Sequence, residues 1–206
     1  YTFSTYRIAT MIRRGALGET LAFIFLPLVL LGIYHIIFKD SKKWYLLTLG
    51  MTCLVLSHLI STLIAIVFVG CLSIINGKVL YNERRRFYDL IKATVATIGL
   101  TIFYFVPIGE QLIFQQLRVR NAPVFNISEE GLSLVEFVIN TLTNNPYEVT
   151  IGLIPAVFII FYIAKFSKLS KFTKQLISIA LIFWLFSLKL LSIDFLDKTL
   201  FNNIQF

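Results

Sequence analysis

Three arginines and one glutamate lie close together near the beginning of the sequence, and together they could hold a phosphate group: Arg7, Arg13, Arg14 and Glu19. A guanidinium group presents a planar fork of donors that matches phosphate oxygens. The backbone amides at the start of a following helix also suit anions. Glu19 could complement the dipole of that helix, act as a base, or pair with Arg13 or Arg14.

The same segment has the pattern of a short amphipathic helix. Helical spacing over 4–14 would put Arg7, Thr10 and Arg14 on one face and apolar side chains on another. Such a helix would lie in a membrane interface, with its arginines facing water and headgroups. Two interpretations remain open: the arginines hold a lipid phosphate, or they anchor the segment to headgroups without any chemistry.

A histidine in the middle of a long apolar run is the second candidate. His58 stands between Ser57 and Ser61 within the run over 44–75. A neutral imidazole there could hydrogen-bond a hydroxyl-rich ligand or a phosphate. The alternative is that His58 satisfies free carbonyls at a helix break, alongside the two serines. The predicted lipid-phosphate site therefore comprises Arg7, Arg13, Arg14, Glu19 and His58.

No nucleotide-binding or metal-binding motif accompanies these residues. The sequence has neither a glycine-rich nucleotide fingerprint nor a complete phosphate loop. His35 and His58 have no acidic neighbour in sequence, which argues against a zinc site or a Ser-His-Asp triad. Cys53 and Cys71 lie inside apolar runs, where they behave as small hydrophobes. We therefore expect no metal and no cofactor, and we name no catalytic residue.

The composition indicates the environment in which these residues act. Of 206 residues, 57% are hydrophobic and 15% are charged, 20 are phenylalanine, and the mean hydropathy is +0.81. Soluble proteins have about 45–50% apolar and about 25% charged residues. The net charge is +8, but the basic residues form short clusters between apolar runs. That is the positive-inside pattern of a multi-pass protein of the cell membrane, so we expect membrane lipids rather than nucleic acid as partners.

Four apolar runs are long enough to be read as membrane helices, and they cover 21–38, 88–112, 150–166 and 173–191. The fold class is therefore predicted as all-α, a polytopic transmembrane helical bundle. We expect the whole range 1–206 to form a single transmembrane domain. The sequence starts at Tyr1 without Met, and we expect it to be a fragment of a longer protein.

The run over 44–75 needs separate treatment because it is too long for one crossing. As one helix it would extend about 48 Å, against a hydrocarbon core of about 30 Å. Both of its flanks, 39–43 and 84–86, are basic and thus look cytoplasmic. A segment that leaves and returns to one side must cross twice. We predict two short helices, 44–56 and 59–75, which brings the total to about six; a single tilted helix is the alternative.

This topology divides the charges unequally. The predicted cytoplasmic segments 39–43, 76–92 and 165–174 hold twelve of the nineteen Lys and Arg residues. The segment 113–148 then forms an extracytoplasmic loop. Within that loop, 133–143 has the pattern of a short amphipathic helix on the outer membrane surface, and a plain packed loop helix is the alternative.

Several stretches of the first 75 residues are also familiar as a group. They are RGALGE over 14–19, FLPLVLLGIY over 25–34, WYLLTLGM over 44–51 and LSHLIS over 56–61. In these the chain resembles bacterial multi-pass membrane proteins that carry the 6-pyruvoyl-tetrahydropterin-synthase-related membrane domain. Those proteins are distantly similar to YfhO-like proteins and to the GT-C glycosyltransferases. The resemblance implies an acidic catalytic residue in a first outer loop, which would lie upstream of Tyr1.

The resemblance and the residues lead to one functional expectation and two alternatives. The chain would be part of a GT-C-like glycosyltransferase that uses a polyprenyl-phosphate-linked sugar in cell-envelope glycosylation. It could instead be a non-catalytic membrane scaffold that assembles with other membrane subunits of an envelope complex. The third reading is a transporter or flippase, but no run carries the paired acids or broken repeats that transporters often show.

Overall fold

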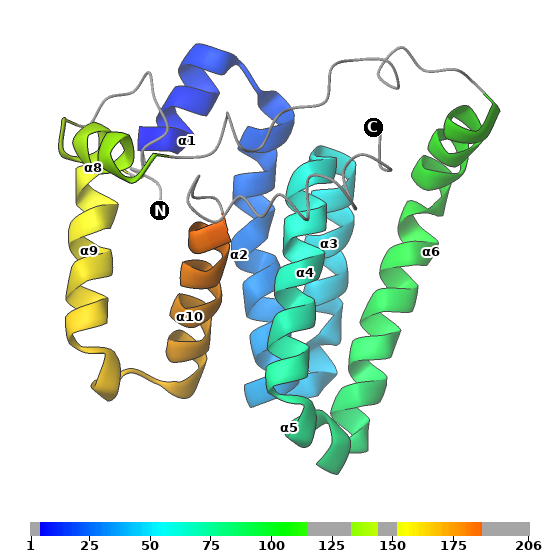
Figure 1. Ribbon diagram of the computed structural model, residues 1–206. Helices are drawn as coiled ribbons and strands as arrows, with labels where there is room; N and C mark the ends of the chain where they lie inside the picture. Colours follow the sequence, from blue (N-terminus) through cyan, green and yellow to red (C-terminus); the bar gives the residue numbers. More distant parts are fainter. Residues whose placement is uncertain (1–4, 115–132, 144–151, 187–206) are drawn as a thin grey trace. The chain divides into compact units, whose positions relative to one another are not determined.

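The computed structural model describes residues 5–114, 133–143 and 152–186, and within these ranges every regular element is a helix. The prediction of an all-α fold is therefore confirmed for this part of the chain. The residues form two compact units (Figure 1). One unit covers 10–107, and the other combines 1–9 with 108–206. That the chain makes a single domain stays a prediction.

The unit 10–107 is a set of helices that alternate in direction (Figure 1). Its elements are a π-helical turn η1 (Thr10–Arg14), α2 (Leu17–Phe38), the 3-10 turn η2 (Ser41–Trp44), α3 (Tyr45–Ser57), α4 (Leu59–Ile75), α5 (Gly77–Asn82) and α6 (Arg84–Phe114). The helix α6 continues beyond the unit boundary at Pro107. The predicted run 21–38 is thus found four residues longer at its start.

Two glycines let α2 and α3 pack with their backbones close together. A Cβ atom added at Gly32 would collide with the backbone of Leu47, and one added at Gly50 would stand 2.8 Å from the amide nitrogen of Val29. The numbers of these pairs run in opposite directions, so the two helices are antiparallel. Around the contact lie fully buried side chains, among them Ile33 and Leu54. Small residues of this kind are typical of tight helix packing in membranes.

The long apolar run breaks at His58, near the predicted position. The helix α3 ends at Ser57, and α4 begins at Leu59. Between them His58 has extended backbone angles, with φ of −156° and ψ of 112°. In Figure 1 the two helices lie side by side and run in opposite directions. The prediction of two helices in place of one is confirmed.

The first helix of this hairpin and the turn before it contact the start of α6. The hydroxyl of Ser41 donates to Asp89, and the hydroxyl of Thr48 donates to the carbonyl oxygen of Ala93 at 3.3 Å. Because both pairs increase in number together, α6 runs parallel to α3. Lys42 and Arg85 consequently lie at the same end of the unit, as predicted; on which side of a membrane that end lies stays a prediction.

The other unit contains α1 (Thr5–Ala9) together with described helices of the second half of the chain. The latter are α8 (Leu134–Thr143), α9 (Leu153–Ala164), the 3-10 turn η4 (Phe166–Lys168) and α10 (Lys171–Phe186). The ring of Phe137 in α8 lies 5.7 Å from the ring of Trp184 in α10. The predicted helix over 133–143 is confirmed, and Glu136 is exposed on it. Of the predicted loop 113–148, residues 115–132 and 144–148 lie outside the described ranges.

Two described helices, α2 and α6, are long and apolar enough to cross a membrane, judged by length and composition. The other apolar helices are shorter. Thus α3, with 13 residues, extends about 20 Å against a hydrocarbon core of about 30 Å. The finer prediction of six membrane helices is therefore not established by helix length in the described ranges.

Candidate functional site

Two of the predicted site residues form an ion pair at the start of α2. The Nη1 atom of Arg14 donates to Oε2 of Glu19 at 3.3 Å. Glu19 lies in the first turn of α2, where a carboxylate complements the positive end of the helix dipole. Its side chain is 14% exposed, whereas that of Arg14 is 58% exposed. The carboxylate therefore holds a guanidinium group that remains largely accessible to a ligand.

The His58 break lies against the same turn of α2. A Cβ atom added at Gly18 would stand 2.5 Å from the carbonyl oxygen of Ser57 and 3.8 Å from Cδ2 of His58. Only a glycine permits this approach, and Glu19 is the next residue. The fold thus brings Arg14, Glu19 and His58, which are up to 44 positions apart, to one end of the unit. We call these three residues the α2-start cluster.

The imidazole of His58 caps the N-terminus of α4. Its Nδ1 atom accepts the backbone amide of Ser61 at 3.3 Å and lies 2.9 Å from the Ser61 hydroxyl. The sequence analysis left open that the ring donates to free carbonyl oxygens at the helix break. In the structure the ring instead accepts a hydrogen bond from a backbone amide. The hydroxyl of Ser57 donates to the carbonyl oxygen of Cys53 at 2.6 Å. With Nδ1 accepting a hydrogen bond, the proton of a neutral ring resides on Nε2, which is then a donor.

The other predicted site residues stand differently. Arg7 is half-buried in α1, which belongs to the other compact unit. The backbone of Arg13 belongs to η1, and its side chain lies outside the described part of the structure. Thr10 was predicted to share a water-facing side with Arg7 and Arg14, and this is wrong. Its side chain is fully buried at the start of η1.

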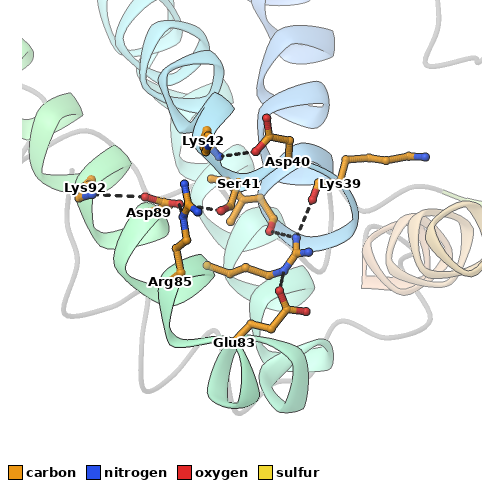
Figure 2. Close-up of polar contacts among 10 residues, drawn as sticks. Lys39, Asp40, Ser41, Lys42, Glu83, Arg85, Asp89 and Lys92 are labelled. Atoms are coloured by element: carbon orange, nitrogen blue, oxygen red, sulfur yellow. Dashed lines mark hydrogen bonds and ion pairs between the residues drawn. The ribbon is translucent and has the colours of Figure 1, made fainter.

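A second polar cluster, which the sequence did not suggest, lies at the other end of the unit (Figure 2). Its centre is Asp89, whose side chain is 5% exposed. The Oδ2 atom accepts the hydroxyl of Ser41 at 2.7 Å and lies 3.9 Å from Nε of Arg85. The Oδ1 atom lies 3.5 Å from Nζ of Lys92. We call Ser41, Arg85, Asp89 and Lys92 the Asp89 cluster.

Beside this cluster, Arg86 at the start of α6 forms hydrogen bonds with the backbone at the end of α2. Its Nη1 atom donates to the carbonyl oxygens of Ile36 at 2.8 Å and of Lys39 at 3.1 Å. Its Nε atom donates to Glu83 at 2.6 Å. The last carbonyls of a helix lack partners within the helix, and a cation there also opposes the negative end of the dipole. Arg86 is therefore a structural residue.

An open pocket of about 560 Å³ lies next to the Asp89 cluster, and we call it the basic pocket. Its lining comprises Lys42, Trp44, Arg84, Arg85, Tyr88, Asp89, Ile91 and Lys92. Sequence reasoning had assigned these basic residues to topology alone. The missed signal was Asp89, an acid among basic residues at the edge of an apolar run, but its partner Ser41 is 48 positions away.

The described residues contain no group of three His, Cys, Asp or Glu side chains that could hold a metal ion. Both clusters consist of ion pairs and hydrogen bonds. No protein-family model, curated protein or solved structure matches this chain.

Proposed function

We propose that this chain is a membrane-embedded part of a GT-C-like glycosyltransferase, and that its α2-start cluster holds the phosphate of a polyprenyl-phosphate-linked sugar. The observation that carries the proposal is the convergence of Arg14, Glu19 and His58 at one end of the helical unit. The role assigned to these residues is binding and positioning.

The exposed surface of α6 supports the membrane location. In the most apolar stretch of this helix 11% of the residues are buried, against 33% in α2. Ile98, Phe103 and Val106 are each more than half exposed. The core helix of a soluble protein buries its apolar side chains, because each large one left in water costs about 1.5–3 kcal/mol. Hydrocarbon removes that cost, so a multi-pass arrangement with α3 and α4 as a short hairpin fits this surface.

The chemistry of the α2-start cluster supports a phosphate ligand. Glu19 accepts a hydrogen bond from Nη1 of Arg14 and so holds the guanidinium group near the start of α2. A fixed guanidinium group can grip two phosphate oxygens through parallel hydrogen bonds. The Nε2–H of His58 adds a donor at the same end, and stabilisation by prepositioned donors is a large part of catalysis in phosphate and sugar transfer.

The test of this proposal replaces the planar guanidinium group of Arg14 with a lysine ammonium group, which keeps the positive charge, and separately removes the carboxylate of Glu19. Arg14→Lys and Glu19→Gln are made in the full-length protein, in cells that lack their own copy, and envelope glycosylation is measured. We expect each change to lower glycosylation about tenfold, since a charge-assisted bond to phosphate contributes roughly 1.5–3 kcal/mol. Abundance in the membrane fraction should stay unchanged.

The matched control is Lys78→Arg, an equally conservative exchange at an exposed residue of α5. It should keep full glycosylation. Headgroup anchoring predicts a different pattern, because attraction to anionic lipid depends mainly on charge. Wild-type glycosylation in Arg14→Lys would therefore reject the phosphate site and favour a non-catalytic membrane scaffold.

A further inference from the structure

We propose that the basic pocket is a second binding site, which takes a phosphate group at the opposite end of the unit from the α2-start cluster. The two sites are separated by the length of α2, whose 22 residues extend about 33 Å. The ligand chemistry is a phosphate, and its favoured source is the headgroup of an anionic phospholipid. The lipid source rests on the proposed membrane location, whereas the phosphate chemistry does not.

The charge of the pocket is the first argument. Four of its lining side chains are cationic, namely Lys42, Arg84, Arg85 and Lys92, and a single one, Asp89, is anionic. Arg86, which follows Arg85 in the sequence, donates to two carbonyls and to Glu83 and does not line the pocket. An uncompensated positive charge in a concave surface raises the local concentration of anions.

The second argument is that Asp89 positions two of the four cationic side chains, those of Arg85 and Lys92. Asp89 is buried and stands three residues before Lys92 and four after Arg85, so both side chains converge on it from one face of α6. The hydrogen bond from Ser41 fixes the carboxylate in turn. Asp89 is therefore a positioning residue, which holds two cations at the pocket wall without neutralising the other two.

The orientation of Arg85 indicates which anion fits. Its Nε atom lies 3.9 Å from Oδ2 of Asp89, and within the described ranges its terminal Nη atoms donate no hydrogen bond. The outer edge of the guanidinium fork is thus available for two oxygens of one ligand. Phosphate offers such a pair of oxygens together with the charge to hold a lysine as well.

The remaining walls favour a lipid headgroup as the source. Trp44, Tyr88 and Ile91 line the same pocket, and Trp and Tyr are enriched where a bilayer meets water. The pocket lies at the C-terminal end of α2 and the N-terminal end of α6, the two helices with the length and composition of membrane spans. A volume of about 560 Å³ is typical of small-molecule sites and exceeds what a bare phosphate needs.

The chain supplies its own probe for this site. It contains two tryptophans, and Trp184 lies in α10, so Trp184→Phe leaves Trp44 of the pocket as the sole reporter. In this background the full chain in neutral detergent is titrated with phosphatidylglycerol, with phosphatidylcholine and with inorganic phosphate. We expect the Trp44 fluorescence to change and saturate with phosphatidylglycerol. Saturation with inorganic phosphate at similar concentrations would instead identify free phosphate as the source.

A pair of adjacent lysines gives the matched control. Lys42 lines the pocket and Lys43 does not, and both are exposed. One positive charge near the ligand changes affinity about fivefold, from roughly 1 kcal/mol per basic residue. We expect Lys42→Gln to weaken binding about fivefold and Lys43→Gln to leave it unchanged. Equal effects of the two changes would overturn the proposal, because they would indicate general attraction to a basic surface.

The variant Asp89→Asn distinguishes a positioned binding site from general attraction to a basic surface, because the two predict opposite changes in affinity. It removes a negative charge, so general attraction predicts tighter binding. Loss of the positioning carboxylate predicts weaker binding, since Arg85 and Lys92 would no longer be held at the wall. Tighter binding in Asp89→Asn, or no saturable change with either phosphate source, would refute the site.

This outcome is independent of the glycosyltransferase proposal. Arg14→Lys should leave the Trp44 titration unchanged, since Arg14 lies at the other end of α2. Flotation of the purified chain with phosphatidylcholine vesicles tests membrane insertion separately. A chain that fails to float but binds inorganic phosphate would refute the lipid source and retain the phosphate site.

Discussion

The hydroxyl of Ser41 donates a 2.7 Å hydrogen bond to the buried carboxylate of Asp89, 48 positions further along the chain. This bond joins the turn after α2 to the first turns of α6. We expect Ser41→Ala to lower the free energy of unfolding by about 1–2 kcal/mol, because a buried carboxylate loses a partner. Thermal unfolding in detergent, followed by circular dichroism, measures the effect.

Ser73→Ala is the control for that measurement. Its hydroxyl donates to the carbonyl of Val69 within the same helix at 2.8 Å. Such a bond inside one helix contributes little, so the change should stay within about 0.5 kcal/mol. A cost for Ser41→Ala no larger than that of Ser73→Ala would show that the link between the two segments is not stabilising.

The second prediction concerns Arg86, which donates to the carbonyls of Ile36 and Lys39 at the end of α2. Arg86→Gln should destabilise the chain by about 1–2 kcal/mol, since charged hydrogen bonds and the helix-dipole term are lost together. The neighbouring Arg84→Gln removes the same charge without these bonds and should cost less than about 0.5 kcal/mol. Equal melting temperatures for the two variants would contradict the structural role of Arg86.

The third prediction tests the close packing of α2 and α3. Gly32→Ala places a methyl group against the backbone of Leu47, which cannot move aside as a side chain could. We expect a loss of about 1–3 kcal/mol. At Gly70, nothing lies within 4 Å of an added Cβ atom, so Gly70→Ala should be neutral or stabilise α4 by up to about 1 kcal/mol. Thermal unfolding of the two variants and the wild type, measured in parallel, gives the sign of each change in stability.

The fourth prediction separates the two possible roles of His58. His58→Asn keeps a side-chain acceptor for the Ser61 amide, whereas His58→Ala loses it. The alanine variant should be less stable by about 1 kcal/mol, as for other lost N-caps, and the asparagine variant close to wild type. If His58 also contacts the ligand, the stable His58→Asn variant should still lower glycosylation. Full glycosylation in that variant would reduce His58 to a helix cap.

The fifth prediction concerns orientation. In a variant in which Cys53 and Cys71 are replaced by serine, single cysteines are introduced as Lys42→Cys, Arg85→Cys and Glu136→Cys. A membrane-impermeant thiol reagent applied to intact cells should label the last and leave the first two unlabelled. Labelling of Lys42→Cys alone would be incompatible with its shared pocket with Arg85.

Charge and hydropathy patterns were sufficient to predict most of the helices. The basic flanks of the run 44–75 indicated two helices in place of one, and the polar residues Ser57, His58 and Ser61 near its middle indicated where the break lies. Neither glycine nor proline stands at that point. By contrast, α5 was not predicted, because its six residues lie within a segment read as a cytoplasmic connection.

The candidate site was predictable in part. Arg14 and Glu19 are five positions apart in the sequence, and their proximity indicated Arg13 or Arg14 as the partner of Glu19; the structure shows that it is Arg14. Helical spacing placed Thr10 on the same face as Arg7 and Arg14, whereas its side chain is fully buried. The Asp89 cluster was missed because its bond to Ser41 depends on how α6 packs against the end of α2, a tertiary contact that residue patterns do not encode.

The hairpin of α3 and α4 has a consequence for how such a chain can change in evolution. The segment leaves from the end that contains Ser41 and returns to the end that contains Asp89, and these two residues touch. Loss or duplication of the whole hairpin would preserve the direction of α6 relative to α2, because α3 and α4 run in opposite directions. Loss of α3 or α4 alone would reverse that direction. Deletions and insertions should therefore be tolerated here as pairs of helices, with the junction placed between Ser41 and Asp89.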